Sequence, residues 1–442
     1  MAAELTIMRG AGPGRDLTKL DQYRRIGGYA QLERARELDR AAIIEEISEA
    51  SLRGRGGAGF PMGRKLSLVP GPDKRTGPAY VVCNADESEP GAFKDREIMR
   101  LTPHRLLEGC LIAAHALDAR NVFIYIRGEY LAEYEVLVAA VEEARAAGIF
   151  GEVDVLVHRG AGAYICGEES ALLDSLEGKR GQPRPRPPFP PVTGLYGRPT
   201  LINNVQTLAS VPAILELGIE RYKELGVESA PGTVVYSLSG NVNRPGNYEL
   251  PLGTTLRELI FDWGHGVPDG RALKAIIPGG SSVPVFTPEQ LDVQLDFDSV
   301  QAAGSFLGSA AVIVVDERAC MVQLGLRAEK FYMHESCGKC TPCREGTRWL
   351  VQLLERIEDG HGTQGDLDLL RNVCDRILGK SLCALGDFAV WCIASYVDKF
   401  TDEFQRHVDE GGCPFGGESS LEGVVAPSDQ HTHSPVASPV PA

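Results

Sequence analysis

Strand-like and helix-like patterns alternate between residues 79 and 178, and this alternation constrains the fold more than any other feature of the chain. Short apolar, β-branched or aromatic runs occupy residues 79–86, 121–128 and 153–160. Helical spacing of apolar residues characterises the intervening segments, which are 102–119, 130–148 and 167–178. Strands separated by helices predict a parallel sheet that is covered on both faces. We therefore predict an α/β fold for this region.

The rest of the chain changes in pattern several times. A proline-rich stretch at 182–194 cannot form a helix or a central strand, so it is predicted to be an extended loop, and residues 200–218 are predicted to be helical. The tail is rich in Ser, Pro and His, a composition typical of disorder. The predicted regions are an N-terminal segment with the α/β domain at 1–229, a compact β-rich domain at 230–318, a helical domain at 319–410 and a disordered tail at 411–442.

Composition excludes several classes of protein. The formal charge of −15 argues against a nucleic-acid-binding protein, which needs a basic face. No apolar run approaches the roughly 20 residues of a membrane span, and the N-terminus does not resemble a signal peptide. The 11 cysteines are odd in number, which favours free thiols or metal ligands over a disulfide framework. We therefore expect a cytoplasmic protein that is not inserted into a membrane.

A glycine-rich segment at 52–65 contains G-x-G-x-x-G at Gly54, Gly56 and Gly59. Glycines at this density let the backbone approach a phosphate or a planar ring. A helix-like segment precedes the motif, so the strand context of a dinucleotide-binding fingerprint is missing. On its own the motif is weak evidence, and a flexible glycine loop is the less favoured alternative.

Two polar loops directly follow predicted strands. The first, at 84–95, contains four acidic residues, and the second, at 159–172, leads into a helix and contains Tyr164. In open α/β sheets ligands bind beyond the carboxyl ends of strands, so the coincidence of two such loops predicts a ligand site there. The paired amides in NNVQT, at 203–207, are suited to phosphate or flavin edges, although a helix cap is the alternative.

The cysteines of ESCGKCTPCRE, at 335–345, are the strongest chemical signal. C-x₂-C-x₂-C with a distant fourth cysteine is typical of a [4Fe–4S] cluster, whereas zinc sites more often use separated pairs or histidine. The candidates for the fourth ligand are Cys320, Cys374, Cys383, Cys392, Cys413 and His334. Cys383 is favoured because it lies at a break between two predicted helices. A zinc site remains the alternative at this stage.

Five motifs together resemble one family: GRGGAGFP, NADESEPG, GAGAYICGEESAL, LINNVQT and ESCGKCTPCREGT with SLCALGD. In order and spacing, from about residue 25 to 405, they are similar to the F subunit of bacterial NADH:quinone oxidoreductase, which is the NADH- and FMN-binding flavoprotein of respiratory complex I. The resemblance implies a Rossmann-like FMN/NADH domain, a small ubiquitin-like β-grasp domain and a C-terminal helical bundle that carries one [4Fe–4S] cluster.

The resemblance also implies a set of site residues. FMN contacts are expected at Gly54, Gly56, Lys65, Asn84, Asp86, Glu87, Ser88, Tyr164, Gly167, Glu168, Ile202, Asn203, Asn204 and Thr207. NADH contacts are expected at Phe60, Lys65, Glu89, Tyr164, Glu169, Arg186 and Phe189. Cluster ligands are expected at Cys337, Cys340, Cys343 and Cys383. The chain departs from the family pattern at Leu66, where Trp is usual, at Leu68, where an aromatic residue is frequent, and at Arg186, where Lys is common.

By the same resemblance, NADH delivers hydride directly to FMN, and electrons pass singly to the cluster and towards quinone, so no catalytic acid or base is expected. Glu89 and Glu169 are expected to disfavour the additional phosphate of NADPH. Expected partners are a thioredoxin-like [2Fe–2S] subunit and a large multi-cluster iron–sulfur subunit, at the cytoplasmic side of the cell membrane. The nearer alternative is the diaphorase subunit of an NAD-linked hydrogenase or formate dehydrogenase, and the more distant one is a non-catalytic iron–sulfur or zinc scaffold.

Overall fold

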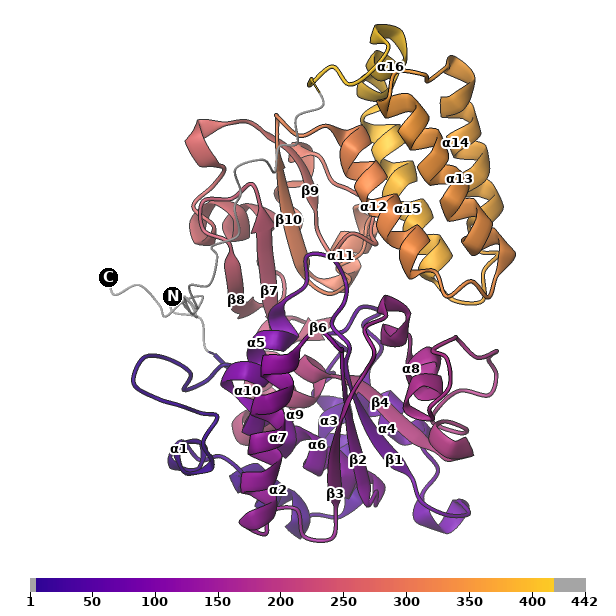
Figure 1. The fold of residues 1–442 in the computed structure, drawn as a ribbon. Coiled ribbons are helices and arrows are strands. Elements are labelled where there is room, and N and C mark those ends of the chain that lie inside the picture. Colours follow the sequence, from indigo (N-terminus) through magenta and orange to yellow (C-terminus); the bar gives the residue numbers. More distant parts are fainter. Residues whose placement is uncertain (1–4, 417–442) are drawn as a thin grey trace.

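The structure, a computed structural model, describes residues 5–416 of the 442-residue chain. Three packed units are visible in Figure 1: an α/β unit, a unit built on a small sheet, and a bundle of helices. Most of the predicted disordered tail, from residue 417 onward, lies outside the described residues. Between residues 5 and 416 no helix is both long enough and apolar enough to cross a lipid bilayer.

The α/β unit is built on a four-stranded sheet whose order is β3-β2-β1-β4. Its strands are β1 (Tyr80–Ala85), β2 (Asn121–Ile126), β3 (Asp154–Arg159) and β4 (Thr200–Asn204). All three strand pairs are parallel. The parallel sheet predicted from the alternating pattern is therefore confirmed.

The prediction of a helix over 200–218 was wrong at its start. Residues Thr200–Asn204 form β4, which pairs with β1, and the helix α9 (Val205–Leu217) begins only afterwards. The strand and helix join without a loop because the Asn204 side chain accepts hydrogen bonds from the N–H groups of Gln206 and Thr207. Both elements are almost fully buried, so no change in hydrophobic period marks the boundary.

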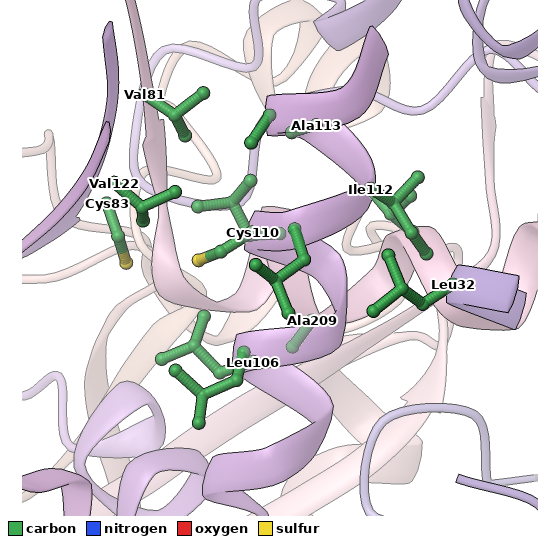
Figure 2. Packing of buried hydrophobic residues seen from close by; sticks show 14 of the residues in the cluster. Leu32, Val81, Cys83, Leu106, Cys110, Ile112, Ala113, Val122 and Ala209 are labelled. Atoms are coloured by element: carbon green, nitrogen blue, oxygen red, sulfur yellow. The ribbon is translucent and has the colours of Figure 1, made fainter. Parts of the chain in front are cut away.

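Helices cover both faces of this sheet. On one face lie α6 (Pro103–Leu117), α7 (Leu131–Ala146) and α9, and on the other lies α8 (Glu169–Leu176). In Figure 2, Leu106 and Cys110 of α6 point towards Val81, Cys83 and Val122 of the sheet. Because side chains alternate along a strand, Val82 packs on the opposite face. Burial on both faces explains why the central strand β1 and its neighbour β2 are largely apolar, whereas the edge strand β3 is partly exposed.

Shorter elements complete this unit and connect it to the next one. Its other elements are α1 (Leu20–Arg25), α2 (Ala30–Glu37), α3 (Arg40–Glu49), α4 (Met62–Leu68), α5 (Lys94–Leu101), α10 (Ile219–Lys223), β5 (Gly226–Val227) and β6 (Ala230–Pro231).

The second unit is a small mixed sheet of order β8-β7-β10-β9. Its strands are β7 (Thr233–Gly240), β8 (Gly246–Pro251), β9 (Leu273–Ile277) and β10 (Ala311–Asp316). The central strands β7 and β10 are parallel, and the outer pairs are antiparallel. A helical segment at Glu258–Trp263 and the helix α11 (Phe297–Ala302) accompany the sheet. The arrangement agrees with the β-grasp prediction.

The third unit is the helical bundle. Its helices are α12 (Met321–Glu335), α13 (Thr341–Glu358), α14 (Gln364–Ile377), α15 (Leu385–Lys399) and α16 (Thr401–Glu410). A single apolar cluster contains residues of this bundle, of the sheet face that α8 covers, and of β9 and β10 in the second sheet. The three units therefore pack as one body around a shared interior.

Candidate functional site

A cavity of about 610 Å³ lies where the three units meet, at the carboxyl ends of β1 and β4. Its size is typical of cofactor pockets, which span about 300–1,000 Å³. Most of the expected FMN contacts line it, namely Gly56, Asn84, Asp86, Glu87, Ser88, Tyr164, Gly167, Glu168 and Asn204. Glu89, an expected NADH contact, lies in the same wall. The fold thus brings together the glycine-rich segment and both polar loops.

The glycine-rich segment reaches the cavity as a narrow loop between α3 and α4. A Cβ atom at Gly56 would lie 2.6 Å from the Cβ of Asn204, so a side chain does not fit there without displacement. The N–H of Gly54 donates to the carbonyl oxygen of Phe60 at 3.0 Å and closes the loop. Gly59 adopts a φ of +64°, which favours glycine, and lies against the ring of Phe297. The loop therefore exposes backbone where a ligand can approach it.

Two asparagines anchor the polar edge of the cavity. The Asn84 side chain donates to the carbonyl oxygen of Gly167 at 2.9 Å and so ties the end of β1 to the segment after β3. The Asn204 Nδ2 donates to Asp95 at 2.5 Å. The cap alternative considered for NNVQT is therefore correct for Asn204, and the same residue also lines the cavity.

The acidic loop after β1 is partly neutral at pH 7. Burial raises the pKa of the Asp86 carboxyl to about 7, and it raises the pKa of Glu87 to about 7 as well. Glu87 accepts hydrogen bonds from the N–H groups of Asp95 and Arg96 at the start of α5, at 2.8 and 2.9 Å. Protonation of these carboxyls reduces the repulsion that a fully ionised loop would exert on an anionic ligand.

Glu89 is held inside the cavity wall by donors from two units. The Tyr164 hydroxyl donates to Glu89 Oε2 at 2.7 Å, and the N–H of Ser282 donates to Oε1 at 2.8 Å. Burial raises the pKa of the Glu89 carboxyl, although these hydrogen bonds oppose the shift. Tyr164 is fixed in turn by its edge-to-face contact with Phe331, at 5.1 Å between ring centroids. The aromatic face of Tyr164 is thus rigidly placed.

Several expected NADH contacts lie together, although they do not line the cavity. The Lys65 Nζ contacts Glu169 at 3.3 Å and donates to the carbonyl oxygen of Ile202 at 2.9 Å. Arg186 contacts the same Glu169 carboxylate at 3.1 Å. The aromatic side chains of Phe60 and Phe189 are 41% and 54% exposed, large fractions for apolar rings.

Two further expected FMN contacts, Thr207 and Asn203, are buried and do not line the cavity. Thr207 Oγ1 accepts a hydrogen bond from the N–H of Arg55 at 2.8 Å, next to Gly54 and Gly56. Asn203 is buried, and its Nδ2 has no hydrogen-bond partner among the described residues, but it is not one of the residues that line the cavity. Of the departures from the family pattern, Leu66 packs in the α/β core, whereas Leu68 is 49% exposed.

The four expected cluster ligands come from two loops at one end of the bundle. Cys337 and Cys340 lie in the loop before α13, Cys343 lies in its first turn, and Cys383 lies between α14 and α15. The N–H of Leu382 donates to Cys340 Sγ at 3.3 Å, so the two loops are in contact. Burial raises the pKa of the Cys383 thiol to about 12, and the nearby Cys343 and Cys337 thiols add to the shift. Thiols that converge in this way suit a positively charged iron–sulfur core, which holds them as thiolates.

The expected ligand Cys383 also faces the cavity. Cys383, Ala384 and Leu385 form part of its wall, together with expected flavin contacts of the α/β unit such as Asn84 and Tyr164. A cofactor in the cavity would therefore lie next to the loop that carries the distant cysteine.

The sequence did not predict the cavity residues that come from the second unit and from the helical bundle. The ring of Phe297 in α11 lies 4.2 Å from the Arg53 guanidinium and covers the glycine loop. Phe306 and Trp391 pack together, with 4.8 Å between ring centroids, and close another side. Lys94 is 1% exposed, lines the cavity and contacts Asp95 at 2.8 Å. Of these residues, only Lys94 could have been noticed in the sequence, as the one cation within the acidic loop at 84–95.

Comparison with known proteins agrees with this geometry. The Nuo51 FMN-binding domain family matches residues 47–213, the NADH-ubiquinone oxidoreductase-F iron-sulfur binding region matches residues 324–407, and the SLBB domain matches residues 235–286. The NADH-quinone oxidoreductase F subunit of Mycobacterium bovis is 52% identical over 411 residues, which cover 91% of this chain and 92% of that protein. The chain belongs to the family of NADH-quinone oxidoreductase F subunits.

Other members of this family have similar coverage. The F subunit of Streptomyces coelicolor is 52% identical over 90% of this chain and 89% of its own length, and that of Rickettsia typhi is 45% identical over 90% and 96%. Among solved structures, the NAD⁺-reducing [NiFe]-hydrogenase in the H₂-reduced state matches with a TM-score of 0.78 and 35% identity over 85% of this chain. This chain spans 64% of that hydrogenase chain, less than two thirds. The match to the iron–sulfur binding region includes all four expected cluster ligands.

Proposed function

We propose that this chain oxidises NADH as the FMN- and [4Fe–4S]-containing flavoprotein subunit of respiratory complex I. The observation that carries the proposal is the position of Cys383, which lies in the wall of the same cavity as Gly56 and Asn84. Because Cys383 is both an expected cluster ligand and a part of the cavity wall, a flavin in the cavity would lie close to the cluster, and electrons could pass between them. The names of the relatives, NADH-quinone oxidoreductase F subunits, support the same activity.

The cavity has features that fit FMN. The loop at Gly56 lacks room for a side chain, which is the form of a backbone cradle for a phosphate or a ring. Tyr164 offers a fixed aromatic face in the cavity wall. We assign the FMN contacts to the residues expected from the family, with Lys94 as an additional cavity cation.

The features of the cysteine loops fit a [4Fe–4S] cluster. The two segments supply four thiols, the number that a [4Fe–4S] cluster requires, and the N–H of Leu382 donates to Cys340 Sγ. We assign Cys337, Cys340, Cys343 and Cys383 as the cluster ligands.

When bound, FMN supplies a two-electron acceptor for the NADH hydride and a one-electron donor to the cluster. The work of the chain is to position the reactants and to exclude water. Tyr164, held by Glu89, fixes one side of the cavity, and Phe306 and Trp391 shield another. No side chain has to move a proton for hydride transfer, so no catalytic acid or base is proposed.

We assign NADH binding to the region of Lys65, Glu169 and Arg186. The exposed rings of Phe60 and Phe189 are available to stack on the nucleotide. Lys65 and Arg186 both contact the Glu169 carboxylate. Its negative charge offsets part of their positive charge and so weakens the binding of a further phosphate there. This arrangement supports a preference for NADH over NADPH, because the carboxylate already compensates the cations that an additional phosphate would need.

The relatives are named as subunits, which implies a multi-subunit complex. We propose a thioredoxin-like [2Fe–2S] subunit and a large multi-cluster iron–sulfur subunit as direct partners, in a peripheral arm on the cytoplasmic side of the cell membrane. The proposed domain limits remain 1–229, 230–318 and 319–410.

The test is NADH-dependent reduction of ferricyanide by the purified chain, with and without added FMN. We expect activity that depends on FMN and that is much lower with NADPH. Comparable kcat/KM values for NADH and NADPH would contradict the assigned specificity, and an FMN-independent rate would contradict the assigned cofactor.

One observation favours a second assembly. The NAD⁺-reducing [NiFe]-hydrogenase has the same fold over most of this chain, so a diaphorase role in a hydrogenase is the alternative. Subunits that co-purify with the native protein decide between the two. Proton-pumping subunits indicate complex I, whereas a nickel-containing subunit indicates the alternative.

A further inference from the structure

A second group of potential metal ligands lies in the helical bundle, apart from the cluster cysteines. Cys320, Glu358, His407 and Cys413 place their ligand atoms within 4.8 Å of one another. Cys320 Sγ lies 3.2 Å from His407 Nε2 and 3.9 Å from Glu358 Oε2. The His407 Nε2 also lies 3.3 Å from Glu358 Oε2. The four side chains therefore point towards one common centre.

The four ligands come from four separate places in the bundle. Cys320 precedes the first turn of α12, Glu358 ends α13, His407 lies in α16, and Cys413 lies three residues beyond α16. The 15 residues of α12 separate this group from the loop of Cys337, a rise of about 22 Å. Figure 1 shows α16 at the end of the bundle that is remote from the first sheet.

Neighbouring groups orient each of the buried ligands. The His407 Nδ1 lies 2.7 Å from the carbonyl oxygen of Glu403, so Nδ1 carries the proton and Nε2 presents its lone pair to the centre. Gln323 acts on two ligands, because its N–H donates to Cys320 Sγ at 3.4 Å and its Nε2 donates to Glu358 Oε1 at 2.9 Å. These contacts leave Glu358 Oε2 directed at the centre. Such outer hydrogen bonds are typical of protein metal sites.

We propose that Cys320, Glu358, His407 and Cys413 bind one structural Zn²⁺ ion. Two thiolates, one imidazole nitrogen and one carboxylate oxygen form a four-ligand set of the type that zinc prefers. His407 is fully buried and Cys320 is 4% exposed, so a divalent cation compensates negative charge that water cannot solvate. With all four positions filled by protein, the ion fastens the segment after α16 to the start of α12.

The experiment measures zinc and iron per chain in the full-length protein, purified anaerobically from zinc-containing medium. We expect about one zinc in the wild type, and a fall of at least fivefold in Cys413→Ser and in His407→Ala, with iron unchanged. Cys383→Ser is expected to show the opposite pattern, with iron lost and zinc retained. X-ray absorption at the zinc edge should show sulfur ligands at about 2.3 Å.

Three further variants test whether zinc binds elsewhere in the chain and whether a loss of zinc reflects poor folding. A His431→Ala/His433→Ala double variant should keep its zinc, which excludes binding by the tail histidines. Cys374→Ser removes a buried thiol of the same bundle and should keep zinc too. Cys413→His retains a ligand at a partly buried position and should restore zinc binding if Cys413→Ser folds poorly.

A wild-type protein without zinc would overturn the proposal, and so would zinc that persists in both Cys413→Ser and His407→Ala. A Cys320–Cys413 disulfide in the anaerobic protein, detected as a loss of two titratable thiols, would overturn it as well. Zinc coordinated only by oxygen and nitrogen would indicate an adventitious ion and would also overturn it.

Discussion

The backbone N–H of Leu382 donates a hydrogen bond to the Sγ of Cys340, 42 positions earlier in the chain, at 3.3 Å. This bond joins the loop of Cys383 to the loop that carries the three closely spaced cysteines. Because Cys383 also lines the cavity, one short loop connects the proposed cluster with the proposed flavin site. The proposed route of electron transfer in this protein depends on that connection.

Replacement of Cys383 should separate the two redox centres. In Cys383→Ser we expect iron to fall from about four atoms per chain to below one. FMN content and NADH-dependent ferricyanide reduction should stay within about threefold of the wild type, because the flavin contacts are untouched. Iron analysis and activity assays test this, and a variant that keeps its full iron content would contradict the assignment of Cys383 as a ligand.

Gly56→Ala should impair FMN binding. The new Cβ would lie 2.6 Å from Asn204, whose side chain caps α9 and donates to Asp95, so it cannot move without losing those bonds. Overpacking of this kind costs about 1–3 kcal/mol, which predicts an FMN affinity about fivefold to 150-fold lower. Gly12→Ala is the control, because its Cβ would meet no atom within 4 Å. An unchanged Kd for FMN, measured by fluorescence quenching, would contradict the cradle.

Glu169→Gln should relax the preference for NADH. The substitution removes the carboxylate that Lys65 and Arg186 share, so an additional phosphate finds two cations that are less compensated, although Arg186 keeps its contact with Glu168 at 3.4 Å. We expect the ratio of kcat/KM for NADPH to that for NADH to rise roughly tenfold, the effect of about 1.4 kcal/mol. Glu177→Gln, which removes a carboxylate shared by Lys179 and Arg184 while Arg184 keeps Asp174, is the matched control. A ratio that rises equally in both variants would show that net charge, rather than Glu169, decides the specificity.

Stability should fall as the pH rises through the range in which Asp86 ionises in the folded chain. Burial raises the pKa of the Asp86 carboxyl from 3.8 to about 7, so the folded state holds a proton that the unfolded state has released. The free energy of unfolding therefore decreases between about pH 4 and about pH 7. In Asp86→Asn this decline should be shallower, as measured by urea unfolding of the FMN-free protein at several pH values. Glu152→Gln, at an 80% exposed carboxylate, should keep the wild-type slope, and an equal slope in Asp86→Asn would contradict the shift.

Much of the fold follows from local sequence patterns. The strands of the α/β sheet are short runs bounded by polar residues, and the helices between them have clear apolar spacing. Cys383 could be selected because it lies at a break between α14 and α15, where a side chain is free to face a neighbouring loop. β4 could not be recognised, because it passes into α9 without a loop and both are buried.

The parts that the sequence did not reveal depend on contacts between distant segments. Phe297 covers the glycine loop from a different unit, and no local pattern relates it to Arg53. The proposed zinc ligands are also dispersed, since Cys320 lies 38 positions from Glu358 and 87 from His407. Cys320 and Cys413 were candidates only for the iron–sulfur cluster, because nothing in their spacing indicated a partnership with His407.

The most direct test of the central claim is the visible and electron paramagnetic resonance spectra of the anaerobically purified protein, before and after addition of NADH. The proposed electron transfer predicts flavin bands that bleach, together with the signal of a reduced [4Fe–4S] cluster. An iron-containing protein that binds no flavin, even after incubation with FMN, would contradict the assignment of the cavity. Bleached flavin with a cluster that stays oxidised would contradict the proposed transfer of electrons past Cys383.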